Sequence, residues 1–242
     1  MKRRSFLAAG VSAGVVLAGC AGNSDGSSAD GSGGNGDGTP TPTATPDDSP
    51  TLDTHPAATG LEGQPTLGPD PAEAPAVIVA YEDPSCPRCA SFETEVVPQL
   101  RSEHVESGDL SLAFRGYPVV YEWGQPATRA LEAAYDRSAD AHWALAEHYF
   151  RSQDDFRYGD LSEVYPKTER VLDEATDIDG KTVVREAEDG VYDDAVQTDL
   201  DAGQAAGAGQ TTPHLFLFRD GVYQTKASGY VSVDVITSAL QL

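Results

Sequence analysis

The sequence predicts an α/β domain with a central mixed sheet and an inserted set of helices, and three observations lead to this prediction. The apolar run 76–81 has the continuous hydrophobicity of a strand that is buried on both faces. A helical pattern follows it, in which Phe92, Val96 and Leu100 recur every four residues. A second group of strand and turn signals begins only after residue 209, so a long middle part with helical patterns separates the two groups of strands.

The first element in chain order is a predicted signal peptide over residues 1–19. A charged start at residues 2–4 precedes an apolar run of twelve residues, 7–18, which is too short to span a bilayer. Arg3-Arg4 followed by Ser5-Phe6-Leu7 resembles a twin-arginine export signal, and Leu-Ala-Gly-Cys at 17–20 resembles a lipobox. We therefore expect lipid attachment at Cys20, on the extracytoplasmic face of the cell membrane. The alternative is an ordinary secretory signal in which Cys20 is incidental.

Residues 20–58 are predicted to be a disordered linker, which leaves 59–242 for the folded domain. From residue 21 to about 56 the chain consists almost wholly of Gly, Ser, Asp, Thr and Pro, with hardly any large apolar side chain. A flexible segment of this length has a root-mean-square span of about 30 Å. We interpret it as a tether that holds the domain away from a membrane surface.

The chain is strongly acidic, with a formal net charge of −23. This charge argues against a nucleic acid partner. The carboxylates are spread through linker and domain and lysine is scarce, which is the pattern of adaptation to high salt in halophilic archaea. A mildly acidic secreted protein and a substrate-steering charge are the two alternatives.

The cysteines indicate the chemistry. Of three, Cys20 belongs to the lipobox, and the other two form Cys86-Pro87-Arg88-Cys89 at the predicted start of a helix. An exported pair meets an oxidising compartment, where a disulfide forms and persists. The helix dipole contributes only about 0.3 to 1 kcal/mol, so direct N–H···S contacts must help to lower the thiol pKa, and the charge of Arg88 is a further candidate contribution. Cys86 at the exposed end is the predicted nucleophile, and Cys89 inside the first turn is the predicted resolving thiol.

Two other uses of the pair remain open. A zinc site would need further ligands among the five histidines, which show no recognised ligand spacing, and we expect no metal site. Delivery of copper or another soft metal is the non-enzymatic alternative, although the only methionine is Met1. A lipid-anchored binding protein, in which the cysteines merely staple a loop, is the third interpretation.

The downstream half of the domain begins with Thr212-Pro213. A strand is expected near 214–219, a hairpin turn at Asp220-Gly221, a second strand near 222–227 and a closing helix over 231–240. Earlier strands are expected near 75–82 and 110–116.

With Cys86-Pro87-Arg88-Cys89 on one side and Thr212-Pro213 on the other, the chain resembles the thioredoxin superfamily. It is similar to the DsbA-like branch in particular, in which helices are inserted between the two halves of the fold. The segments that carry this resemblance are Gly-Gln-Pro-Thr-Leu-Gly at 63–68, Val-Val-Pro-Gln-Leu at 96–100, Phe-Arg-Gly-Tyr-Pro at 114–118, and helical stretches at 127–135, 141–150 and 192–208. It implies an insertion over about 124–208 and a cis Pro213 that faces the cysteine pair.

The resemblance also implies a function. A DsbA-like protein is a thiol-disulfide oxidoreductase of protein cysteines, needs no cofactor beyond its own Cys86–Cys89 disulfide, and is recycled by a membrane redox partner. The oxidase direction is favoured.

Two positions depart from the pattern of the family. Ala80 stands where many members have a buried carboxylate that moves protons for the second cysteine. Glu82 and Asp83 are nearby, and strand alternation predicts that Glu82 shares the face of Ala80 but lies nearer the surface. His214 follows the proline where a small hydroxyl residue is common, and we do not assign it a catalytic role.

Overall fold

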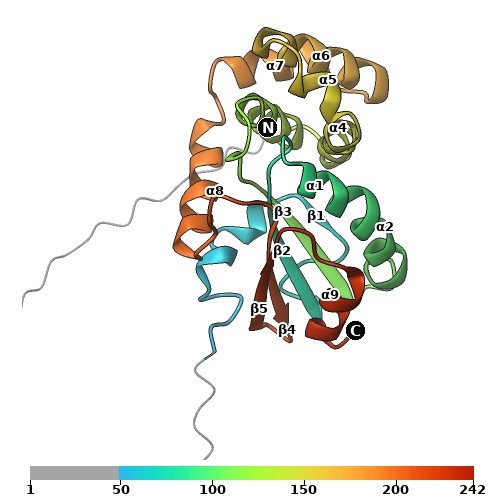
Figure 1. The fold of residues 1–242 in the computed structure, drawn as a ribbon, viewed down its shortest axis with the longest axis vertical. Coiled ribbons are helices and arrows are strands. Elements are labelled where there is room, and N and C mark those ends of the chain that lie inside the picture. The colour runs from blue at the N-terminus through green and yellow to red at the C-terminus, as the bar shows by residue number, and fades with distance from the viewer. Residues whose placement is uncertain (1–48) are drawn as a thin grey trace, which may run out of the picture. The chain divides into compact units, whose positions relative to one another are not determined.

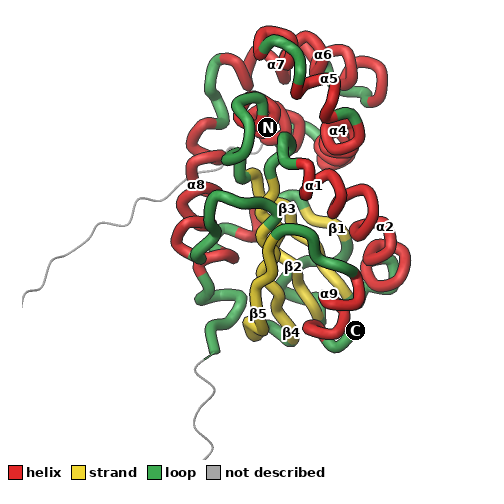
Figure 2. The backbone as a smooth tube through the Cα atoms, viewed as in Figure 1, coloured by secondary structure: helices red, strands yellow, loops and turns green. Residues whose placement is uncertain are grey.

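The computed structural model describes residues 49–242, so the predicted signal peptide, Cys20 and most of the predicted linker lie outside the described part. Its centre is a five-stranded mixed sheet in the order β1-β3-β2-β4-β5 (Figures 1 and 2). The strands β2 and β3 are parallel, and the other neighbouring pairs are antiparallel. The bounds are β1 (Thr66–Leu67), β2 (Ala76–Glu82), β3 (Leu110–Gly116), β4 (His214–Arg219) and β5 (Val222–Ser228). The mixed sheet confirms the predicted α/β fold class.

The central strands lie where their apolar runs predict them, because both faces of β2, β3 and β4 are covered. Every residue of β2 and β3 is buried. Ala76, Ile78 and Ala80 pack on one face with the helix over residues 87–105, which carries the cysteines and is called the active-site helix, and with the C-terminal helix. Val77 and Tyr81 pack on the other face. The short strand β1 is not in the prediction, since two residues are too few to show an alternating pattern.

The helix after β2 is a continuous run of four segments: α1 (Pro87–Ser91), the π-helical turn η3 (Phe92–Val96), α2 (Val97–Leu100) and the π-helical turn η4 (Arg101–Val105). Pro98 has no N–H to donate to the carbonyl of Thr94, four residues back. Just before it the turn is wider, and the N–H of Val97 donates to the carbonyl of Phe92, five residues back. The predicted helix is therefore present, with a π-turn that the spacing of apolar residues did not indicate.

Between β3 and β4 the chain forms the helical insertion, whose members are α3 (Gly124–Tyr135), α4 (Ala139–Arg151), α5 (Gln153–Arg157), η5 (Leu161–Glu163), α6 (Val164–Ala175), α7 (Gly180–Glu188) and α8 (Asp193–Ala205). Figure 1 shows α4 to α7 gathered beyond the N-terminal end of α1, whereas α8 runs back beside the sheet. The last helix is α9 (Val233–Leu240). In the described part of the chain, no helix combines the length and apolar composition that crossing a bilayer requires.

The start of the domain differs from the expected boundary at residue 59. Thr51 forms a β-bridge with Val222, and the N–H of Tyr223 donates to the carbonyl of Pro50 at 2.9 Å. The ring of His55 stacks on Tyr223 with centroids 4.4 Å apart. Two short 3-10 turns follow, η1 (Pro56–Ala58) and η2 (Leu61–Gly63). Residues 50–52 cover the open edge of β5. The ordered domain thus begins inside the stretch that composition assigned to the linker.

Candidate redox site

The cysteine pair lies at the start of the active-site helix, as predicted. Cys86 is the N-cap residue of α1, with extended backbone dihedrals, and Pro87 occupies the first helical turn, where its missing N–H costs nothing. The N–H of Cys86 donates to the carbonyl of Asp83 at 2.9 Å, which closes a tight turn after β2. The structure holds the pair as two thiols; Cys86 is 4% exposed and Cys89 is fully buried.

The two thiols have opposite electrostatic surroundings. The thiol of Cys89 donates a hydrogen bond to the sulfur of Cys86, and this bond is the main cause that lowers the pKa of Cys86 to about 5, against the effect of burial. The backbone N–H groups of Arg88 and Cys89 also contribute. Burial and the same hydrogen bond raise the pKa of Cys89 well above its usual range. At neutral pH, Cys86 is therefore a thiolate and Cys89 a thiol, which is the asymmetry that a nucleophile and a resolving thiol require.

The loop before β4 completes the site. The Thr212-Pro213 peptide bond is cis, as the resemblance implied, and the carbonyl of Thr212 lies 3.3 Å from the Cys86 Sγ. A pocket of about 280 Å³ opens beside the sulfur, lined by Cys86, Pro87, Arg88, Val120, Gln210, Thr211 and Thr212. The fold thus brings Arg88, which is exposed, and Thr212 together over the sulfur, although more than 120 residues separate them in the sequence.

Asp83 fixes the loop that carries the cysteines. One carboxylate oxygen accepts hydrogen bonds from the N–H and the hydroxyl of Ser85, and the other accepts from the N–H groups of Val119 and Val120 at 2.8 and 2.7 Å. Gly124 approaches so closely that a Cβ there would lie 2.3 Å from the carboxylate. Asp83 is completely buried, and with four donors around it this carboxylate holds the loop in place.

The insertion contributes one direct contact to the same loop. The side-chain amide of Gln153 in α5 donates to the carbonyls of Pro84 at 2.8 Å and Cys86 at 2.9 Å. The sequence alone does not predict this contact or the hydrogen bonds of Asp83, because both join segments that are distant along the chain. The only local signal for these hydrogen bonds is the turn-forming sequence Asp83-Pro84-Ser85 immediately before Cys86.

Glu82 lies elsewhere than predicted. It shares the face of Ala80, as alternation requires, but its side chain is completely buried rather than near the surface. The reason is that β2 continues through Glu82, which pairs with Gly116, while the carbonyl of Glu82 accepts the N–H of Tyr117 at 2.7 Å. Both carboxylate oxygens lack a hydrogen-bond donor. Burial raises the pKa of Glu82 well above its usual range, with Glu93 as the next cause. A buried acid is therefore present near the cysteines, two residues along the strand from the position where the family pattern has it.

His214 supports the loop from behind. Its Nε2 accepts the N–H of Gly209 at 3.0 Å, and its side chain is nearly buried on the face of the sheet away from the active-site helix. It does not line the pocket beside Cys86. The histidine thus has a local structural contact with the loop that precedes Thr212-Pro213.

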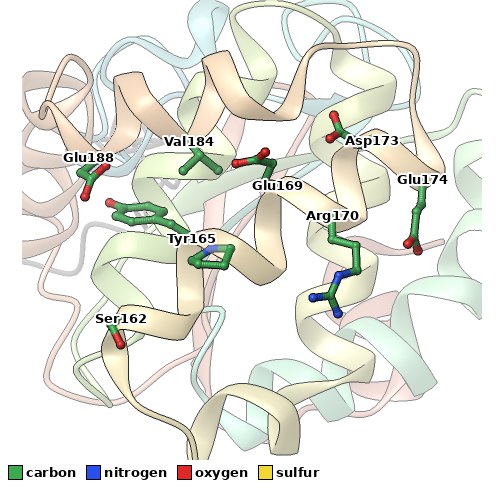
Figure 3. A pocket seen from close by; sticks show the side chains of 9 residues that line it. Ser162, Tyr165, Glu169, Arg170, Asp173, Glu174, Val184 and Glu188 are labelled. Atoms are coloured by element: carbon green, nitrogen blue, oxygen red, sulfur yellow. The ribbon is translucent and has the colours of Figure 1, made fainter.

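A larger groove of about 760 Å³ lies on the insertion, between α6 and α7, and Figure 3 shows its acidic rim with Glu169, Asp173 and Glu174 on α6 and Glu188 on α7. It shares no residue with the cysteine site. Within residues 49–242, no cluster of three or more histidine, cysteine or acidic side chains has the arrangement of a metal site.

The chain is similar to known proteins. A family model described as Thioredoxin matches residues 62–227. Disulfide bond formation protein D of Bacillus subtilis is 28% identical over 95 residues, which are 39% of this chain and 42% of that protein. The probable disulfide bond formation protein D of Bacillus anthracis is 30% identical over 90 residues, 37% of this chain and 41% of that protein. These matches therefore span about two fifths of the relatives' length.

Solved structures show the same fold. Oxidised BdbD from Bacillus subtilis has a TM-score of 0.63 at 20% identity, covering 80% of this chain and 94% of that one. The α-DsbA1 protein of Wolbachia pipientis also has a TM-score of 0.63 at 20% identity, over 74% of this chain and 89% of that one.

Proposed function

The chain belongs to the thioredoxin family, and from this premise we propose that it is an extracytoplasmic thiol-disulfide oxidoreductase that oxidises cysteines of other proteins. One observation carries the proposal: Cys86, with a pKa of about 5, lies at a pocket between the active-site helix and the Thr212-Pro213 loop, with Cys89 buried beneath it. The names of the relatives, disulfide bond formation proteins, agree with this chemistry.

The reaction starts from the Cys86–Cys89 disulfide. A substrate thiolate attacks the Cys86 sulfur, so that a mixed disulfide forms, the Cys86–Cys89 bond breaks and Cys89 leaves as a thiolate that takes up a proton. A second substrate thiolate then attacks the substrate sulfur of the mixed disulfide and releases Cys86 as a thiolate. In total, two electrons pass from the substrate dithiol to the pair. Of the two substrate protons, one ends on Cys89 and one is released to solvent. The protein's own disulfide is the only oxidant.

The oxidase direction is supported by the pKa of Cys86. A thiol with a pKa of about 5 instead of 9 stabilises the reduced pair at pH 7 by about 2.7 kcal/mol, because the thiolate is the form that is populated. For a two-electron couple this free energy corresponds to about 60 mV toward a more oxidising potential. Cys89 does not contribute to this stabilisation of the reduced pair, since its raised pKa keeps it a thiol at pH 7.

Export and lipid attachment are part of the proposal and rest on the sequence. The Arg3-Arg4 motif and the lipobox at Cys20 support a twin-arginine-exported lipoprotein of a halophilic archaeon. A membrane redox partner would then reoxidise Cys86 and Cys89 after each turnover. The variant Cys20→Ser should leave the membrane fraction and appear in the medium, and retention of the variant in membranes would contradict lipid attachment.

The roles of the two cysteines are tested by trapping a covalent complex between the reduced variants and a substrate protein that carries a disulfide. All variants carry Cys20→Ser, which is the matched control and leaves the pair as the only cysteines. Adding Cys86→Ser should abolish exchange and give no complex. Adding Cys89→Ser should leave attack by Cys86 on an oxidised substrate intact, and a mixed disulfide should persist on a non-reducing gel. A complex trapped by Cys86→Ser instead would reverse the assignment, and exchange without Cys86 would end the proposal.

A further inference from the structure

We propose that His214 is a positioning residue for the substrate pocket and that its protonation weakens the exchange with protein substrates in acid. As a neutral imidazole it holds one wall of the pocket beside Cys86, and as an imidazolium it releases that wall. The inference rests on the proposed function and adds to it a residue that does not line the pocket itself.

The wall in question is the segment 210–212, which precedes β4. Gln210, Thr211 and Thr212 line the pocket together with the start of α1. The carbonyl of Thr212 lies 3.3 Å from the Cys86 Sγ. A protein substrate that reaches this sulfur therefore contacts the segment, so the position of the segment decides how well a substrate fits.

This wall depends on His214 because the backbone before it has few other contacts. Residues 209–211 are exposed. Within the described part of the chain they make one hydrogen bond, which the N–H of Gly209 donates to the Nε2 of His214 at 3.0 Å. His214 itself is nearly buried in the sheet. The histidine is thus a rigid support for a segment that is otherwise free to move.

The two residues before Gly209 are held independently of His214. The Nζ of Lys226 donates to the carbonyl of Gly207 at 2.8 Å, and the hydroxyl of Tyr117 donates to the carbonyl of Ala208 at 3.3 Å. Protonation of His214 leaves both of these contacts in place. The release is therefore local and moves the pocket wall without unfolding the end of α8.

The hydrogen bond from Gly209 requires a neutral His214. Because Nε2 accepts the N–H, the proton of the neutral ring lies on Nδ1. Both nitrogens of an imidazolium carry a proton, so Nε2–H would face the N–H of Gly209 and the bond would be lost. Nδ1 is buried with no protein acceptor beside it, so the charged ring gains no hydrogen bond in exchange. Protonation therefore separates Gly209 from the ring.

The groups on this face of the sheet favour the neutral ring. Tyr81 of β2 pairs with His214, and Lys226 of β5 lies opposite Phe216, the next residue of β4 on the same face. Burial, and to a smaller extent the charge of Lys226, lower the pKa of His214 below its usual value. The wall is therefore held at neutral pH and released as the pH falls. Further titratable side chains on this face are Tyr117, Tyr223, His55 and the ion pair of Arg115 with Asp199.

The size of the effect follows from the loss of a single hydrogen bond. The net contribution of such a bond corresponds to about a three- to tenfold change in the population of the held wall. Exchange with a peptide substrate should fall by about this factor when His214 is charged. A small thiol, which needs only the sulfur and not the wall, should show no such change.

The test compares two reductants of the oxidised protein, a reduced peptide with two cysteines and dithiothreitol, between about pH 4.5 and 7.5. All proteins carry Cys20→Ser, and reduction is followed by acid quenching and mass spectrometry. Dividing the rate constant for the peptide by that for dithiothreitol removes the pH dependence of thiolate attack that the two share. In the wild type this ratio should fall about three- to tenfold toward acid, with the midpoint of the His214 titration measured by NMR of the ring.

Two substitutions separate the titration from the presence of a side chain. His214→Gln provides an oxygen that accepts the N–H of Gly209 at every pH, so the ratio should stay at the neutral value of the wild type. His214→Leu has no acceptor, so the ratio should stay at the low value that the wild type reaches in acid. His104→Gln, near the end of the active-site helix, is the matched control and should follow the wild type.

A wild-type pH dependence in folded His214→Gln would overturn the effect of protonation. A ratio for His214→Gln at pH 7 as low as the acid value of the wild type would overturn the hydrogen bond as the support of the wall. Both outcomes are read from His214→Gln, so they stand even where His214→Leu does not fold. If dithiothreitol reduced the pair but the peptide was not oxidised at any pH, the proposed function would be refuted instead, so the two failures are distinguishable.

Discussion

The reactivity of Cys86 depends on a hydrogen bond that one substitution removes. In the structure the thiol of Cys89 donates to the Cys86 sulfur, and this bond is the largest single cause of the low pKa of Cys86. A hydrogen bond to a charged group contributes about 1.5 to 3 kcal/mol, which corresponds to about one to two pKa units. Cys89→Ala should therefore raise the pKa of Cys86 from about 5 to between about 6 and 7.

The assay is the ultraviolet absorbance of the thiolate as a function of pH. At pH 6 the thiolate fraction should fall from about nine tenths in the wild type to between about one tenth and one half in Cys89→Ala. Cys86→Ala serves as the reference for absorbance that does not come from this sulfur. The helix dipole alone contributes about 0.3 to 1 kcal/mol, less than one pKa unit. A pKa that stays near 5 in Cys89→Ala would show that the helix terminus and backbone N–H groups suffice, and would refute the assigned role of Cys89.

Three further substitutions test the buried polar groups by urea unfolding. Burial raises the pKa of Glu82, so Glu82 keeps its proton in the folded protein but loses it above about pH 4.5 when the chain is unfolded. Its contribution should therefore lower the free energy of unfolding by about 1.4 kcal/mol per pH unit as the pH rises above that value, and Glu82→Gln should flatten this slope relative to Glu95→Gln, the control variant at an exposed acid. Equal slopes in the two variants would contradict a protonated Glu82. Asp83→Ala should lower the free energy of unfolding by at least about 2 kcal/mol, because the N–H groups of Val119 and Val120 lose their hydrogen-bond acceptor. An unchanged urea midpoint would contradict the role of Asp83 in holding the loop. The guanidinium of Arg115 in β3 forms a buried ion pair at 2.6 Å with the carboxylate of Asp199 in α8. Arg115→Met should lower the free energy of unfolding by about 3 to 5 kcal/mol, since it leaves the buried Asp199 without its cation, whereas adding Asp199→Leu should recover most of the loss. A double variant no more stable than the single one would refute this account.

Much of the fold follows from local sequence. The strands β2, β3, β4 and β5 lie within two residues of their predicted positions, because continuous or hairpin-flanked apolar runs leave little choice of structure. The helix start at Cys86 is set by Pro87 and by the four-residue spacing of buried side chains. The segments α5, η5, α6 and α7 have no counterpart among the predicted elements, since their sequences are rich in charged residues and α6 and α7 are stabilised by packing on α3 and α4 as well as on each other.

By itself, the sequence determined that this chain carries a cysteine pair at a helix start, because this depends on residue type and short-range spacing, whereas the cis Pro213 that faces the pair followed only from the resemblance to the thioredoxin superfamily. Only the tertiary structure decided how the surrounding acids behave. Glu82 and Asp83 are neighbours of the same charge, yet one lies without a hydrogen-bond donor beside Glu93 and the other accepts four hydrogen bonds. The difference arises because Ser85 and the loop before α3 place donors around Asp83, whereas no donor lies next to the carboxyl group of Glu82. Contacts between segments that are distant along the chain have no signature in a single sequence.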